Sequence, residues 1–70
     1  SPAILGIGFG LTPRQHHVAG LLLHGLSSRE IALQLGASVE TVRSHVKQVL
    51  HKTRQSRVSG FVRTFARVPE

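Results

Sequence analysis

Two helix starts stand eleven residues apart in this chain, with a glycine between them. Ser27 and Glu30 form the first start as a capping box, and Ser38 begins the second start two residues after Gly36. Because glycine adopts the positive φ that ends a helix without a side-chain clash, a tight turn of about three to four residues is expected there. The pattern predicts two helices, over residues 28–35 and 39–53, that meet at roughly 90 to 120° as a helix-turn-helix.

One further helix is expected before this pair and another after it. Thr12, Pro13 and Gln15 combine a capping hydroxyl, a proline suited to the first helical position and a capping-box glutamine, which predicts a helix over 13–24. A helix over 57–67 is predicted by an apolar stripe at i, i+3, i+4 and i+7 spacing, made of Val58, Phe61, Val62 and Phe65. The two phenylalanines of this stripe should close the hydrophobic centre.

The expected fold class is all-α: a compact four-helix helix-turn-helix domain over residues 11–68 with no sheet. Residues 1–10 mix glycines with apolar side chains and are expected to form a linker or docking arm. The chain begins without methionine, so we expect it to be part of a longer protein. It has no apolar run of the roughly 20 residues that span a bilayer and no secretory signal, so a cytoplasmic location without membrane contact is expected.

The composition disfavours most kinds of catalytic site. The chain has nine Lys and Arg against three Glu, with no Asp and no Cys. Paired-carboxylate catalysis, oxygen-ligand calcium or magnesium sites and thiolate zinc sites therefore lack their usual groups. The five histidines include no i,i+4 pair, and neither a nucleophile elbow nor a glycine-rich phosphate loop is present. We expect no enzyme activity, no cofactor and no metal site.

Basic charge is concentrated in the second half of the chain. Residues 41–69 carry seven Lys and Arg and no acidic residue, a distribution typical of segments that bind polyanions. A helical projection of residues 39–53 and the position after them places in one sector Glu40, Arg43, Ser44, Lys47, His51 and Arg54. Arg43 and Lys47 are predicted to contact base edges in the DNA major groove. The alternative is a solvated face on which Glu40 pairs with Arg43, an interaction worth only ~0.2–0.5 kcal/mol.

A resemblance to the LuxR/GerE-type DNA-binding domain of bacterial transcription regulators is carried by the stretch LTPRQHHVAGLLLHGLSSREIALQLGASVETVRSHVKQVLHK. It extends over about residues 11–67 and is densest at Gly25-Leu26-Ser27, Glu30-Ile31-Ala32, Thr41-Val42-Arg43 and His45-Val46-Lys47. It implies a four-helix domain of the LuxR C-terminal effector type that binds double-stranded DNA, typically as a dimer.

The resemblance also implies roles for individual positions. The base-facing positions are those of Arg43, Ser44 and Lys47. A phosphate contact is implied for Thr41, and His51 and Arg54 on the same outer face are expected at phosphates as well. Glu30 is implied to be a buried or semi-buried partner that ties its helix to the frame.

Partners other than DNA are expected at two places. The outward side of the last helix is a candidate homodimer face, made of Gly60, Arg63, Thr64 and Arg67. Like-charged arginines facing their own copies would repel unless offset or screened by salt, so a monomer is an equal expectation. Leu33 is expected to be exposed, and it is a candidate contact with an upstream regulatory domain or RNA polymerase.

Two departures from the family pattern leave alternatives open. Gln15 stands where the family usually has Glu, and the segment KTRQSRV is one residue shorter than the usual connection to the last helix. A shifted last helix would change or abolish the dimer face. Besides sequence-specific DNA binding in transcription control, the altered connection leaves open a protein-interaction module that has kept the helix-turn-helix scaffold. The promoter-reading region of a sigma factor has a similar helix-turn-helix and is a further alternative, against which the phenylalanine-bearing last helix argues.

Overall fold

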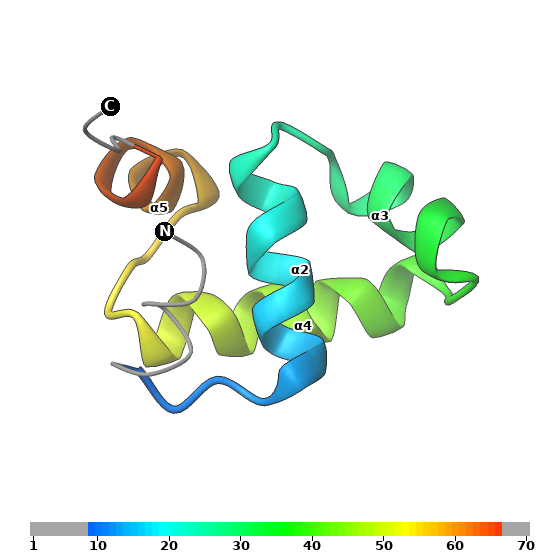
Figure 1. The fold of residues 1–70 in the computed structure, drawn as a ribbon, viewed down its shortest axis with the longest axis horizontal. Helices are drawn as coiled ribbons and strands as arrows, with labels where there is room; N and C mark the ends of the chain where they lie inside the picture. Colours follow the sequence, from blue (N-terminus) through cyan, green and yellow to red (C-terminus); the bar gives the residue numbers. More distant parts are fainter. Residues whose placement is uncertain (1–8, 67–70) are drawn as a thin grey trace.

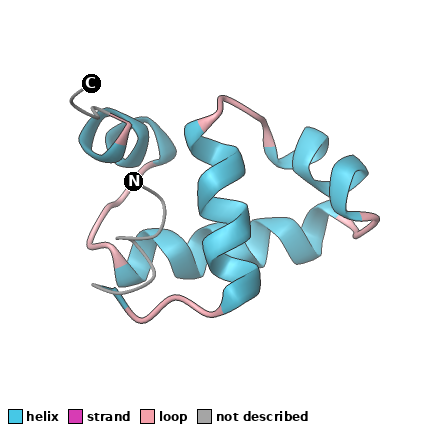
Figure 2. Cartoon of the chain, viewed as in Figure 1, coloured by secondary structure: helices cyan, strands magenta, loops and turns pink. Residues whose placement is uncertain are grey.

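The computed structural model describes residues 9–66 of the chain, which form four helices (Figure 1). In chain order these are α2 (Pro13–Leu23), α3 (Ser28–Leu35), α4 (Val39–Lys52) and α5 (Val58–Phe65). Within the described residues there is no strand, only helices and connecting loops (Figure 2). The prediction of an all-α, four-helix helix-turn-helix domain is confirmed.

The long helix α4 forms the base of the molecule (Figure 1). Helix α2 crosses over it and contacts each of the other three helices, while α3 packs against α2 and α4. Helices α3 and α5 lie on opposite sides of α2 (Figure 1). Helices α2 and α3 therefore cover one side of α4 and leave its other side open.

The helix bounds differ slightly from those expected. Helix α2 ends at Leu23 with His24 as its cap, and α4 ends at Lys52 with Thr53 as its cap, each one residue early. Helix α5 was expected over 57–67 but runs over Val58–Phe65, and its stop coincides with the last member of the apolar stripe. Residues 1–8 of the expected arm and residues 67–70 lie outside the described part of the chain.

The end of the expected arm is packed rather than free. Phe9 is half-buried against the core, and its ring meets that of Phe65 edge-on, with ring centroids 5.4 Å apart and an interplanar angle of 88°. Edge-to-face aromatic pairs of this kind are favourable. The chain entering the domain is therefore attached to its last helix.

Capping side chains begin three of the four helices. The Oγ1 of Thr12 accepts from the N–H of Gln15 at 3.1 Å, while the Oε1 of Gln15 accepts from the N–H of Thr12 at 3.1 Å. Ser27 and Glu30 form the same reciprocal pair at the start of α3. Glu30 is exposed and its carboxylate caps its own helix, so the implied buried partner role is wrong: the capping box holds the carboxylate at the surface.

The turn between α3 and α4 depends on Gly36. Its φ of 67° is left-handed, and the N–H of Ala37 donates to the carbonyl oxygen of Ala32 at 3.0 Å. Ser38 then starts α4 by accepting a bond from the N–H of Thr41 at 3.1 Å. Only two residues separate the glycine from the next helix, which makes this the tight turn of a helix-turn-helix.

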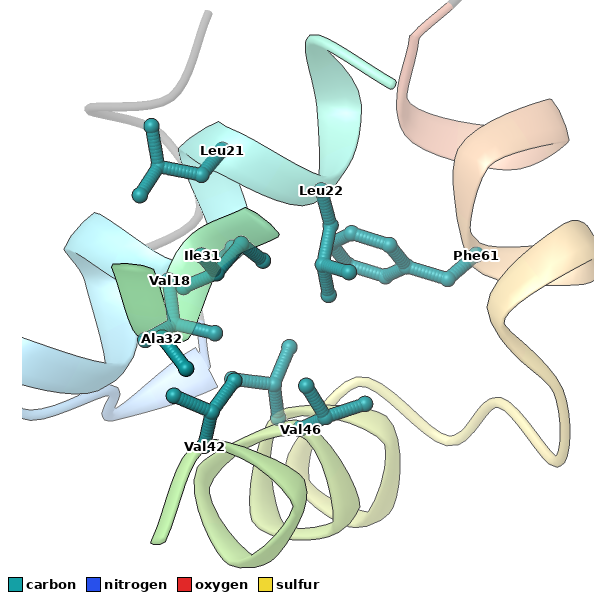
Figure 3. Close-up of a cluster of buried hydrophobic side chains, with 10 residues drawn as sticks. Val18, Leu21, Leu22, Ile31, Ala32, Val42, Val46 and Phe61 are labelled. Atoms are coloured by element: carbon teal, nitrogen blue, oxygen red, sulfur yellow. The ribbon is translucent and has the colours of Figure 1, made fainter. Parts of the chain in front are cut away.

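The hydrophobic core joins all four helices (Figure 3). The largest of its fully buried side chains are Val18, Ile31, Val42, Val49 and Phe61. In Figure 3, Phe61 reaches from α5 toward Leu22 of α2, and Val42 and Val46 point up from α4. The inner face of α4 is therefore fixed by apolar packing, and its outer face is determined by the same helical period.

Candidate nucleic-acid interface

The outer face of α4 is open to solvent where the sequence predicts contact with bases. Arg43, Ser44 and Lys47 are all exposed, whereas Val42 and Val46 on the opposite side of the helix are buried. An arginine side chain offers a planar fork of donors to guanine O6 and N7, and a lysine offers a mobile ammonium group. Within residues 9–66, these three side chains are therefore accessible to a ligand.

The alternative pairing of Glu40 with Arg43 is not found. Both side chains are exposed, and among the described residues no ion pair joins them. The guanidinium of Arg43 is therefore available to an external acceptor.

The three positions predicted at phosphates lie at the two ends of α4. Thr41 is in the first turn, where its exposed hydroxyl oxygen accepts a bond from Ser38 Oγ at 2.8 Å. His51 lies in the last turn and is exposed. Arg54 is exposed just after the helix and has a positive φ of 60°. They thus lie at opposite ends of the helix and do not form one cluster.

A polar network around the buried Gln15 joins α4 to α2, and sequence reasoning missed it. Gln15 is only 4% exposed, and its Nε2 donates to the Oε1 of Gln48. The Nζ of Lys52 donates to the Oε1 of Gln15 at 2.7 Å and to the carbonyl oxygen of Gly10 at 3.1 Å. These contacts join residues 33 to 42 positions apart, which local patterns do not detect. The replacement of Glu by Gln at position 15 was the only signal available.

The candidate dimer face on α5 is only partly as expected. Arg63 and Thr64 are exposed, but Gly60 is half-buried and Arg67 lies outside the described residues. An added Cβ at Gly60 would lie 3.2 Å from Oε1 of Gln55. The space beside this glycine is therefore taken by the chain's own connection between α4 and α5.

No metal site appears in the part of the chain that is described. Within residues 9–66 there is no group of three or more His, Cys, Asp or Glu side chains placed to hold an ion. Three of the histidines, His16, His17 and His24, instead line a hollow of about 380 Å³ on α2 together with Gly20 and Leu21. Among the described helices, none has the length and apolar character needed to cross a membrane.

Comparison with known proteins agrees with this geometry. The model of a family described as bacterial regulatory proteins, luxR family, matches residues 10–59. The chain belongs to the luxR family. This confirms the predicted resemblance and the predicted class of function, DNA binding in transcription regulation. The match ends at the start of α5, so that helix lies mostly beyond it.

Curated relatives of this luxR-family chain are longer proteins. It is 42% identical over 43 residues to "Probable transcriptional regulator ycf29" of Pyropia yezoensis, and this aligned region covers 61% of the chain and 19% of that protein. It is 36% identical over 53 residues to "Transcriptional regulatory protein MctR" of Rhizobium johnstonii, and this aligned region covers 76% of the chain and 25% of that protein. The matched region thus spans a quarter or less of these relatives. No solved structure gives a significant match.

Proposed function

We propose that residues 11–68 are the DNA-binding domain of a cytoplasmic transcription regulator and that α4 lies in the major groove. Arg43, Ser44 and Lys47 contact base edges in this arrangement. The observation that carries the proposal is the contrast along α4: its apolar side is fixed in the core, and its outer side presents unpaired basic groups. A helix held in this way is the reading element of a helix-turn-helix.

Phosphate contacts come from Thr41, His51 and Arg54 in the same proposal. Because phosphates are bound through charge, affinity should fall steeply with salt. A monomer that neutralises four phosphates loses about 3.6 logs of affinity for each tenfold rise in salt on B-DNA. Relatives described as transcriptional regulators support this class of partner.

The test is a gel-shift titration on a duplex selected from a random DNA pool. Arg43→Ala and Lys47→Ala should each weaken binding to the selected duplex by about 1–3 kcal/mol. The matched control is Arg43→Lys, which keeps the charge but loses the bidentate fork. It should retain affinity for random duplex and lose preference for the selected one. Unchanged affinity in both alanine variants would favour a protein-interaction module instead.

Further partners belong to the proposal as well. A homodimer through α5 would place Arg63 and Thr64 of each copy at the two-fold axis, and residues 1–10 would connect the domain to an upstream regulatory domain. Leu33, which is 82% exposed on α3, supports a contact with that domain or with RNA polymerase. Sedimentation of the protein on duplexes with one and with two half-sites tests the dimer. Binding of two copies without cooperativity, unchanged by Arg63→Glu, would rule α5 out as the dimer face.

A further inference from the structure

A hollow beside the Gln15 network is lined by four side chains whose carbon atoms form most of its wall and whose polar ends are hydrogen-bond donors. It has a volume of about 520 Å³ and is lined by Lys47, Gln48, His51 and Lys52, all on α4. Within the described residues no carboxylate lines it. The polar ends of these side chains are two ammonium groups, an amide and an imidazole, and together they suit an anion whose oxygens accept several bonds at once.

The Gln15 network determines which end of the Gln48 amide is left for a ligand. The Oε1 of Gln15 accepts from the N–H of Thr12 at 3.1 Å and from the Nζ of Lys52 at 2.7 Å. Since both of these partners can only donate, the oxygen of Gln15 must face them, and its NH2 group must face Gln48. Gln48 therefore accepts with its oxygen. Its own NH2 group remains to donate outward.

Lys52 is held by the same network. Its ammonium group has three donors, of which two bind Gln15 and the carbonyl oxygen of Gly10. The third donor is left for a ligand. Gln15 is only 4% exposed, so it lies beneath the hollow and does not touch a ligand itself. It orients the amide of Gln48 and holds the ammonium group of Lys52.

The geometry points to this hollow as the binding site of one phosphate of the DNA backbone. Gln48 and Lys52 donate to the phosphate oxygens beside His51, and Gln15 is a positioning residue. The inference rests on the proposed function, since α4 must lie in the groove for a phosphate to reach its last turns. It adds Gln15, Gln48 and Lys52 to the residues that determine DNA affinity.

Gln15→Glu is the discriminating variant. A carboxylate still accepts from Thr12 and Lys52, so the capping box and the link to α4 are kept. It has no hydrogen to donate to Gln48, so the Gln48 amide must turn its oxygen toward the hollow, and the new negative charge offsets that of Lys52. We expect a thermal midpoint that does not fall, an affinity for the selected duplex lower by about tenfold, and a salt slope smaller by about 0.9, the value of one phosphate.

Gln48→Leu removes the amide at similar volume and should lower the affinity for the selected duplex by a similar factor, without a change in the charge of the site. Its matched control is Gln34→Leu, at an exposed glutamine on α3, which should leave affinity and salt slope unchanged. Duplexes with one methylphosphonate at a time then locate the phosphate. One position should weaken the wild-type protein by about tenfold and weaken Gln48→Leu clearly less.

The outcomes separate this inference from the proposed function. If Gln15→Glu and Gln48→Leu bind as the wild type does while Arg43→Ala is weakened, the phosphate site is wrong and the proposed function stands. If the wild type shows no salt-dependent binding to any duplex, both are wrong. If inorganic phosphate alone saturates the Gln48 side-chain amide signals and the methylphosphonate profiles of wild type and Gln48→Leu coincide, the ligand is a free anion, which overturns the assignment to DNA.

Discussion

The backbone N–H of Gln55 donates to the carbonyl oxygen of Leu50 at 2.8 Å, closing the end of α4 around a residue in left-handed conformation. The N–H of that residue, Arg54, donates to the carbonyl oxygen of His51 at 3.2 Å. Together the two bonds form a Schellman motif, which usually has glycine at the position that Arg54 occupies with a φ of 60°. The domain therefore accepts backbone strain at a residue proposed to bind phosphate.

Arg54→Gly should raise stability and lower DNA affinity at once. A left-handed backbone costs a residue with a Cβ on the order of 1–3 kcal/mol, and the greater unfolded-state entropy of glycine offsets about 0.5–1 kcal/mol of the relief. We expect a net gain of about 1 kcal/mol, seen as a thermal midpoint higher by about 4–8 °C. Arg54→Ala is the control: it removes the same charge, keeps the strain and should lose the same affinity without the gain in stability.

Gly60→Ala should stabilise α5 and test the dimer. Gly60 lies inside the helix, where alanine is favoured by roughly 0.5–1 kcal/mol. The added Cβ would meet only the end of the Gln55 side chain, 3.2 Å away, and a flexible side chain can shift. Urea denaturation should show the gain. If α5 also packs against its copy at Gly60, the variant should dimerise less strongly on a two-half-site duplex, and unchanged dimerisation would place the contact elsewhere.

Substitutions at Thr53 should show that its methyl group contributes more to the stability of the domain than its hydroxyl group does. Thr53 is 3% exposed, and its Oγ1 donates to the carbonyl oxygen of Val49 at 2.8 Å. That oxygen also accepts from the N–H of Thr53 at 3.0 Å, so removal of the hydroxyl leaves it paired. Thr53→Val should change the free energy of unfolding by less than about 1 kcal/mol. Thr53→Ser, which loses a buried methyl, should destabilise by about 0.8 kcal/mol or more. The reverse order in chemical denaturation would contradict this assignment.

Phe61→Ala should unfold the domain. Phe61 has no exposed surface and joins α5 to α2 near Leu22 (Figure 3). Truncation of a buried phenylalanine costs about 3–5 kcal/mol, which is a large share of the total stability of a domain this small. Circular dichroism should show lost helix at 25 °C. Phe61→Leu, which keeps most of the volume, should remain folded with a lower midpoint, and a fully folded Phe61→Ala would mean that α5 contributes little to the core.

Local patterns in the sequence were sufficient for the scaffold and for the exposed face of α4. Thr12, Ser27 and Ser38 are capping residues whose effect extends only over the next turn, so they mark helix starts without knowledge of the fold. The 3.6-residue period likewise places Val42 and Val46 opposite Arg43 and Lys47. The four-helix architecture follows from these signals, and the class of function was predicted from the basic outer face of α4 together with the family resemblance. The roles of single residues at the interface remain predictions.

Glu30 shows where the family resemblance fails although the local pattern holds. The spacing from Ser27 predicted the capping box that the structure has, whereas the buried partner role was implied by the resemblance alone. Gln15 meets Gln48 and Lys52 only because α2 crosses α4. Helical period and capping act within a few residues and were determined by the sequence itself. Hydrogen bonds between groups more than thirty positions apart were decided by the tertiary structure, since only the packing of the apolar faces brings those helices together.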